Sequence, residues 1–337
     1  MAKMRVAEVP RAGADFEIVE RDVPSPGPGQ VRIKVAACGI CFSDHFVKDG
    51  QWPGLTYPRV PGHEVAGVID AVGAGVTAWK EGDAAGVGWH GGQDNTCAAC
   101  RAGDFVNCAS QIITGFAYDG GYQEYMVAPV EAVARIPGGF DPAEAAPLFC
   151  AGVTTYNALR HAGVMPGDLV AVQGIGGLGH LGIQFANKAG YRVAAVGRGR
   201  ENEPLAKRLG AHAYIDSKAV NAAEELQKLG GAKLILATAP SSKAMSEIFH
   251  GLGPNGKLLV VGADAQALEI PSVALIMGKR SVQGWASGTP SDSEDTLRFA
   301  ALSGIRPMIE RFPLEKVGEA YERMKSGQAQ FRVVLIL

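Results

Sequence analysis

Three residues far apart in the sequence have side chains suited to binding one metal ion. Cys41 lies in CGICFSD, His63 in PGHEVAGVI and Cys150 in PLFCAGVTTY. Two thiolates and one imidazole that leave a fourth position open are typical of a catalytic zinc ion. These residues are too far apart for their spacing to predict a shared site, so the hypothesis rests on the local sequence around each of them. Cys41 follows a strand pattern, and His63 stands at the entry to another.

A second group of cysteines lies in one short loop, GGQDNTCAACRAGDFVNC, at residues 91–108. Cys97, Cys100 and Cys108 could converge on one ion, but a closed structural zinc site takes four ligands. The fourth is either a residue other than cysteine or absent. The chain has six cysteines, and we expect a reducing compartment, where ligands and plain thiols are more common than disulfides.

A glycine-rich turn in VAVQGIGGLGH indicates dinucleotide binding. Gly174, Gly176 and Gly179 form G-x-G-x-x-G between a strand pattern and a helix pattern, and Gly177 and Leu178 complete the turn. The first glycine permits the tight turn, the second lets the backbone approach a pyrophosphate, and the third lets the helix pack on the strand. The alternative is a tight turn with no ligand.

The next strand pattern ends in VAAVGRGREN, which favours NADP over NAD. An acid at the end of this strand would bind the ribose 2′-hydroxyl of NAD. Gly197 occupies that position, and Arg198 and Arg200 follow. The missing carboxylate removes repulsion against a 2′-phosphate, which an arginine can bind with two hydrogen bonds. The alternative is that both arginines merely face solvent.

The pattern of apolar residues divides the chain into two parts. Up to about residue 140, short strand patterns follow one another, as in QVRIKVAACGI, which suggests a barrel or sandwich. Asp141 and Pro142 then give a helix-start signal, and strands alternate with helices beyond them. That alternation predicts a parallel sheet. The predicted strands are 168–173, 191–196, 234–238, 257–262 and 281–285.

Composition limits the classes of protein that fit. The chain has 337 residues, of which 47% are hydrophobic and 20% charged, and its formal net charge is -2. This length predicts two domains, and the charge balance gives no reason to expect a nucleic-acid partner. The N-terminus lacks an apolar signal region, and no apolar run approaches the roughly 20 residues that span a bilayer. We therefore expect a cytoplasmic protein without membrane contact.

Taken together, these motifs resemble the zinc-dependent medium-chain alcohol dehydrogenase family over essentially the full chain. The matching strings are CGICFSD, PGHEVAGVI, FCAGVTTY, GIGGLGHLGIQFA, GKLLVVG, FRVVLIL and the loop at 94–108. The resemblance implies an α/β protein with a GroES-like β-barrel catalytic domain and a Rossmann domain, a doubly wound parallel sheet. The expected catalytic domain covers 1–151 and is completed by 287–337, and the Rossmann domain covers 152–286. The family has its active site in the cleft between them.

The resemblance also assigns roles to residues. Cys41, His63 and Cys150 would bind the catalytic zinc, with Glu64 behind or beside it. The other implied roles are Ser43 taking the substrate hydroxyl proton, Asp44 orienting His63, Trp52 and Trp89 narrowing the substrate pocket, and Thr154, Arg332, Thr238 and Val261 contacting the cofactor. Arg332 would meet the pyrophosphate.

One position departs from several relatives. Their proton relay ends at a histidine where this chain has Phe46, with His45 just before it. Either His45 substitutes, or the proton leaves through the ribose and water.

The activity implied is reversible hydride transfer between a primary alcohol or aldehyde and NADP(H) or NAD(H), in a homodimer or homotetramer. A zinc-free quinone-type reductase of the same superfamily is one alternative, although it would have no need of the three ligands. A non-catalytic NADP(H)-binding sensor is another.

The family also implies a fourth ligand for the cysteine loop. Its structural zinc loop has four ligands, and counting back from Cys97 by the family spacing leads to Asp94. A carboxylate oxygen binds zinc at about 2.0–2.2 Å, close to imidazole and thiolate lengths. We rank Asp94 first, an empty loop second and His90 third, and so expect two zinc ions per chain.

Overall fold

The computed structural model describes residues 2–337, and they form two compact units. The first unit comprises residues 2–153 and Ser287–Leu337, and the second comprises Thr154–Ala286. Each has its own buried apolar core. None of the helices within the described residues is long and apolar enough to cross a membrane.

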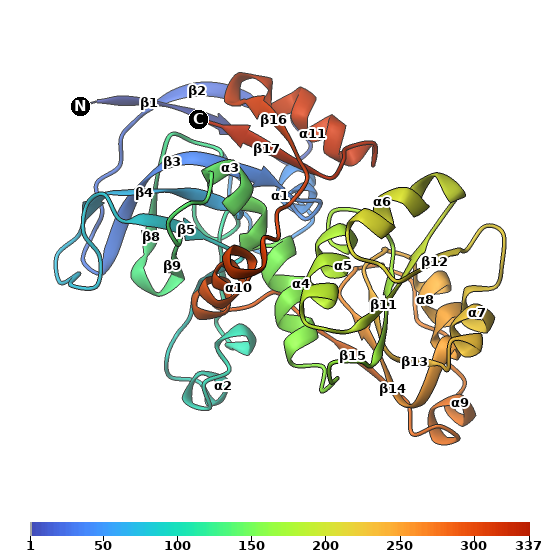
Figure 1. Ribbon diagram of the computed structural model, residues 1–337. Coiled ribbons are helices and arrows are strands. Elements are labelled where there is room, and N and C mark those ends of the chain that lie inside the picture. The colour runs from blue at the N-terminus through green and yellow to red at the C-terminus, as the bar shows by residue number, and fades with distance from the viewer. Residues whose placement is uncertain (1) are drawn as a thin grey trace. The chain divides into compact units, whose positions relative to one another are not determined.

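The first unit is mainly antiparallel β-structure. Its strands are β1 (Lys3–Glu8), β2 (Glu17–Asp22), β3 (Gln30–Ile40), β4 (Val65–Val72), β5 (Ala84–Val87), β6 (His90–Gly92), β7 (Ile112–Ile113), β8 (Tyr125–Pro129), β9 (Val133–Arg135), β16 (Ile309–Pro313) and β17 (Arg332–Ile336). Its helices are α1 (Asp44–Asp49), α2 (Ala98–Arg101), α3 (Pro142–Ala145), α10 (Pro290–Ser303) and α11 (Val317–Lys325). Strand β17, from the end of the chain, lies beside β3 (Figure 1).

Strand β3 is the centre of this unit. Its first half pairs with β8 and its second half pairs with β17, while β4 runs along its other edge. The pairing with β4 shifts register twice, between Arg32 and Ile33 and between Val35 and Ala37. Such irregularities increase the local twist and bend a strand. One strand thereby pairs with two neighbours, β8 and β17, along the same edge.

The second unit is a six-stranded parallel sheet with helices packed on it. Its strands are β10 (Leu169–Gln173), β11 (Arg192–Gly197), β12 (Ala213–Asp216), β13 (Ala232–Ala237), β14 (Leu252–Val260) and β15 (Ser281–Gly284). Its helices are α5 (Gly179–Lys188), α6 (Glu203–Arg208), α7 (Ala222–Lys228), α8 (Ser242–Ile248) and α9 (Ser272–Ile276). The strand order is β12-β11-β10-β13-β14-β15. This is the doubly wound Rossmann order.

The sequence located five of these six strands and missed one. Of the four residues of strand β12, AYID, only Ile215 is buried, so the apolar signal of this strand is weak. Strand β14 begins at Leu252, five residues before the predicted start. The helix-start signal is confirmed, because the Asp141 carboxylate accepts a hydrogen bond from Ala143 N and caps α3. A 3₁₀ turn (Ala146–Phe149) then leads to Cys150 and to α4 (Ala151–Arg160).

Candidate metal centres and nucleotide turn

The fold brings Cys41, His63 and Cys150 together within the first unit. Cys41 follows β3 and His63 precedes β4, and these strands are antiparallel neighbours, so both residues lie at one end of the pair. Ligand atoms of Cys41, His63, Glu64 and Cys150 all lie within 4.8 Å of one another. We call these four residues the Cys41 cluster.

The spacing of the thiols fits a tetrahedral ion. The Sγ atoms of Cys41 and Cys150 are 3.8 Å apart. Two thiolates bound to one zinc at about 2.3 Å in tetrahedral geometry would be separated by roughly 3.8 Å. A hydrogen bond from Cys150 lowers the pKa of the Cys41 thiol well below its ordinary value, so one sulfur is ready to be a thiolate.

Asp44 lies directly behind His63. Its Oδ1 is 3.2 Å from His63 Nδ1, although the two groups are not aligned as a hydrogen bond. Its Oδ2 accepts hydrogen bonds from Cys41 N and Tyr122 Oη, both at 2.8 Å. Burial lowers the pKa of His63, but the charges of Asp44 and Cys41 outweigh it and raise the pKa well above its ordinary value. With Nδ1 toward Asp44, the other ring nitrogen is left to face a metal.

The sequence did not single out Tyr122, which is fully buried and holds Asp44 in place. Its neighbours in sequence are glycine and glutamine, and no motif marks it. Only the fold reveals the contact, because Tyr122 and Asp44 are 78 residues apart.

Glu64 is also buried, and Arg332 is its partner. An Arg332 Nη2 hydrogen bond reaches Glu64 Oε1, and a weaker one reaches Ile40 O at 3.4 Å. Burial raises the pKa of Glu64 to about 8, against the effect of the arginine. A Cβ on Gly39 would stand 2.0 Å from Glu64 Oε2, so only glycine leaves room for this carboxylate.

Glu64 Oε2 is buried without a hydrogen-bond partner among the described residues, and it belongs to the Cys41 cluster. A buried oxygen of this kind needs a partner, which a bound cation would supply. Glu64 lies beside the other members of the Cys41 cluster, and its place behind or beside a metal stays a prediction. Arg332 is occupied by Glu64, and its contact with a cofactor pyrophosphate stays a prediction.

Aromatic rings line the neighbourhood of His63. The Trp89 ring stands edge-on to the His63 ring with centroids 5.0 Å apart. The ring centroids of Trp52 and Trp89 are 6.2 Å apart, and the ring centroid of Phe116 lies within 5.3 Å of those of both tryptophans. Both predicted pocket tryptophans thus belong to one aromatic group, and Phe116 is a member that the sequence did not indicate.

The geometry around Ser43 leaves the proton route open. Ser43 Oγ donates to Cys41 Sγ at 3.1 Å and lies 3.5 Å from His63 Nε2. The His45 Nδ1 atom is 2.7 Å from Phe42 O, and the His45 ring lies tilted against the Phe46 ring, with their centroids 3.9 Å apart. His45 therefore has a local partner, and its role as the end of a relay stays a prediction.

The cysteine loop also closes on itself. Ligand atoms of Asp94, Cys97, Cys100 and Cys108 all lie within 4.8 Å of one another. We call these four the Asp94 cluster. His90 is not a member, and its Nε2 lies 2.7 Å from Gln93 Oε1. Of the two residues considered for the fourth ligand, only Asp94 is placed to contribute.

Backbone amides support this loop. Asp94 Oδ1 accepts hydrogen bonds from Cys97 N and Thr96 N, both at 2.8 Å, and these bonds lower the pKa of Asp94. Its backbone N in turn donates to Cys108 Sγ at 3.3 Å. Asp94 thus shapes the loop with one oxygen and has a second that can face a cation.

The glycine turn of the second unit has the expected form. Gly174 has φ +94°, which favours glycine, and a Cβ on Gly179 would lie 1.9 Å from Gly174 O. A Cβ on Gly176 would meet nothing within 4 Å, so this part of the turn faces open space. The turn therefore combines a forced conformation, a close helix–strand contact and an accessible backbone.

Other predicted cofactor residues lie at the carboxyl ends of neighbouring strands. Thr238 follows β13 and donates from Oγ1 to Gln173 O at 2.8 Å. Val261 follows β14, and its N donates to Ala237 O at 3.1 Å. Thr154 is largely buried on α4. Ligands of doubly wound sheets bind at the carboxyl ends of the strands.

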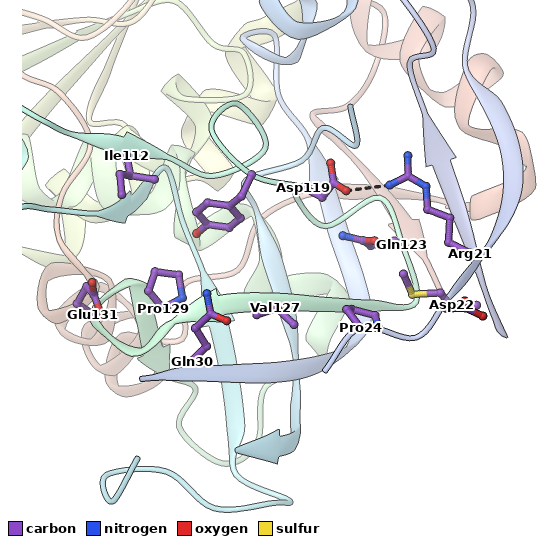
Figure 2. Close-up of a pocket in the computed structure, with 12 residues that line it drawn as sticks. Arg21, Asp22, Pro24, Gln30, Ile112, Asp119, Gln123, Val127, Pro129 and Glu131 are labelled. Carbon is purple, nitrogen blue, oxygen red and sulfur yellow. Dashed lines mark hydrogen bonds and ion pairs between the residues drawn. The ribbon is translucent and has the colours of Figure 1, made fainter. Parts of the chain in front are cut away.

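A cavity of about 460 Å³ lies elsewhere in the first unit. Met4, Gln30, Val127 and Pro129 are among its lining residues, and Figure 2 shows the Asp119–Arg21 ion pair at one side. The described lining includes none of the predicted site residues. This cavity is therefore separate from both metal clusters.

Comparisons with known proteins agree with this architecture. The family model for the alcohol dehydrogenase GroES-like domain matches residues 27–138, and that for the zinc-binding dehydrogenase domain matches residues 177–301. The chain is 45% identical to alcohol dehydrogenase patD of Penicillium expansum over 325 residues, which are 96% of this chain and 95% of that protein.

Two solved structures are similar over nearly the whole chain. A cinnamyl alcohol dehydrogenase, SbCAD4, from Sorghum bicolor has a TM-score of 0.90 at 31% identity and covers 99% of this chain and 98% of its own. A CAD from Helicobacter pylori, complexed with NADP(H), has a TM-score of 0.86 at 27% identity, with coverages of 99% and 98%. The chain belongs to the zinc-dependent medium-chain alcohol dehydrogenase family. Its activity is of the alcohol dehydrogenase/reductase class, with a nicotinamide cofactor.

Proposed function

We propose that this alcohol dehydrogenase depends on zinc and interconverts a primary alcohol and its aldehyde with NADP(H). The observation that carries the proposal is the Cys41 cluster, in which donors from three distant segments lie within 4.8 Å of one another. His63 and Glu64 are fully buried, Cys41 and Cys150 are partly buried, and two thiols with an imidazole are a donor set that suits a zinc ion.

Cys41, His63 and Cys150 would hold the catalytic zinc, with Glu64 beside them. When bound, the zinc supplies Lewis-acid polarisation of the alcohol or carbonyl oxygen, and the nicotinamide supplies the hydride acceptor or donor. Ser43 takes the hydroxyl proton at Oγ and passes it outward. Asp44 fixes the His63 ring, and Tyr122 fixes Asp44.

Aromatic residues support a preference for primary alcohols and aldehydes. The Trp89 ring stands next to His63, and the rings of Trp52 and Phe116 pack against Trp89, so the three reduce the space for a branched substrate. Their apolar faces also keep water from the reacting carbon.

Preference for NADP(H) is supported by the end of β11. Gly197 supplies no carboxylate there, and Arg198 and Arg200 are both exposed. Two guanidinium groups without an acid at residue 197 suit a 2′-phosphate. With NADPH as the cofactor, reduction of the aldehyde is the physiological direction.

A second, structural zinc is proposed for the Asp94 cluster. Three sulfurs and one carboxylate oxygen make a four-donor set, which is the number that a closed zinc site requires. The role of this ion is stability, because no residue proposed for catalysis belongs to this cluster.

We also propose that the chain forms a homodimer or homotetramer through the second unit. Strand β15 is an edge strand whose four residues are all exposed, and exposed edges pair readily with another strand. On α9 and just after it, Val273, Ile276 and Met277 are 60%, 72% and 80% exposed.

A substitution on this exposed apolar surface tests the proposed interface. Ile276→Glu should reduce the mass measured by light scattering. The matched control is Leu302→Glu, at another exposed apolar residue, which should leave the mass unchanged.

One set of measurements tests the proposed activity. Purified protein is assayed with NADH and with NADPH against short, long and aromatic aldehydes, and zinc is counted per chain. We expect two zinc ions, turnover of unbranched aldehydes and a lower KM for NADPH. Turnover by zinc-free protein would contradict the proposal.

A further inference from the structure

Residues at the end of β12 and just after it make hydrogen bonds to the loop that carries Arg198 and Arg200. These strands are parallel, and Gly197 at the end of β11 pairs with Asp216 at the end of β12. Ser217 N and Oγ both donate to Gly197 O at 2.9 Å, and Asp216 Oδ1 accepts from Gly199 N at 2.7 Å. The loop is therefore built before any cofactor arrives.

Tyr214 adds a third contact to this loop. Its Oη donates to Gly199 O at 2.5 Å, so the ring is fixed beneath the chain between Gly197 and Gly199. Gly199 has φ +94°, and glycine is the residue that adopts this conformation without strain.

Gly197 is different, because its backbone does not demand glycine. Its φ lies outside the left-handed region, and it is the last residue of an ordinary strand. The restriction comes from a neighbour. A Cβ on residue 197 would lie 2.6 Å from Tyr214 Oη and 3.1 Å from both Tyr214 Cε2 and Ile175 Cδ1.

We propose that Tyr214 is a specificity-determining residue, because it leaves no room at residue 197 for the acidic side chain that would recognise NAD. The inference rests on the proposed preference for NADP(H). Moving the tyrosine aside would break the hydrogen bond from its hydroxyl to Gly199 O. An acid on residue 197 then has no room to reach a ribose 2′-hydroxyl, while the exposed Arg198 and Arg200 remain in place for a 2′-phosphate.

The test measures dissociation constants of NAD⁺ and NADP⁺ for the zinc-loaded, full-length protein and three variants. The variants are Gly197→Asp, Tyr214→Ala and the double variant. We expect Gly197→Asp to weaken NADP⁺ binding about tenfold or more without strengthening NAD⁺ binding. The double variant should bind NAD⁺ about tenfold more tightly than Gly197→Asp does. Equal NAD⁺ binding by these two variants would overturn the role of Tyr214.

A second measurement separates this inference from the cofactor preference itself. If the wild type binds NAD⁺ more tightly than NADP⁺, the proposed preference fails. The contact is then judged by melting temperatures of Gly197→Ala in the wild-type and Tyr214→Phe backgrounds. A clearly smaller loss in the Tyr214→Phe background supports the steric exclusion, because the hydroxyl at 2.6 Å is gone. Equal losses in both backgrounds would contradict it.

Discussion

The two clusters proposed to bind zinc differ in which segments of the chain supply their donors and in which groups hold those donors in place. Cys41 and Cys150 are 109 residues apart in sequence, and His63 and Glu64 come from a third segment. All four members of the Asp94 cluster lie within residues 94–108. Buried side chains (Asp44, Tyr122 and Arg332) support the first cluster, whereas backbone amides support the second.

This difference fits the two proposed roles, which are catalysis for the Cys41 cluster and stability for the Asp94 cluster. A site assembled from distant segments can be buried and can place a proton acceptor such as Ser43 beside the metal donors. A site made within one loop ties that loop together and needs little from the rest of the fold. A change in the first cluster should therefore affect turnover, and a change in the second should affect melting temperature.

The largest expected effect is at Cys150. Cys150→Ser should reduce turnover to assay background and remove one zinc per chain, because a neutral hydroxyl is a poor zinc ligand. Binding of NADP⁺ should be nearly unchanged. The matched control is Cys38→Ser, since Cys38 is a buried thiol outside both clusters. Turnover retained by Cys150→Ser would refute the assignment.

Asp94 comes next and tests the other side of the comparison. Asp94→Ala should lose one zinc per chain and lower the melting temperature by several degrees, with the second zinc and turnover at the assay temperature retained. Asp94→Asn should melt at a higher temperature than Asp94→Ala, because an amide oxygen can still accept from Cys97 N and Thr96 N. One zinc per chain in the wild type would instead indicate an empty loop.

A smaller effect on zinc affinity is expected from changes at Asp44, which lies behind the His63 ring. Asp44→Asn should lower metal affinity or activity about 10–100-fold, the usual cost of changing a residue that orients a ligand. Tyr122→Phe removes one of the two hydrogen bonds to Asp44 Oδ2 and should have a weaker effect in the same direction. Competition with a chelator measures the affinity. Unchanged zinc retention in Asp44→Asn would show that the fold alone orients His63.

The smallest effect is expected outside both clusters, at the ion pair of Glu310 and Arg323. A hydrogen bond from Arg323 lowers the pKa of Glu310 below its ordinary 4.5. The folded pKa is the lower one, so the pair stabilises above about pH 4.5 and the benefit is lost as pH falls through the folded pKa. Glu310→Gln should cost roughly 0.2–1 kcal/mol near pH 7. Denaturant unfolding at pH 7 and at pH 3 checks this, and an equal cost at both values would contradict it.

Several features of the site could be read directly from the chain. The glycine turn and the cysteine loop depend on short-range spacing, and both have the predicted local form. The distant metal donors were recognised only because each lies in a motif with a family resemblance. Tyr122 and Phe116 carry no motif and were missed, since their importance comes from what the fold places next to them.

Arg332 shows most clearly which contacts could not be predicted from the sequence. Its motif implied a cofactor contact, which stays a prediction, and gave no sign of the buried Glu64 carboxylate against which its guanidinium lies. The antiparallel pairing of β17 with β3 brings these residues together across 268 positions of sequence. No pattern within FRVVLIL contains that information.

Sequence alone determined the alternation that makes a doubly wound sheet, the glycines of the nucleotide turn and the residues proposed as metal donors. These depend on local conformation and on side-chain chemistry, which are properties of short segments. Only the tertiary structure decided which donors meet, that Asp94 rather than His90 joins the loop cysteines, and that Tyr214 occupies the space beside Gly197. Such contacts follow from strand order and register, because pairing distant segments of the chain is what brings their side chains together.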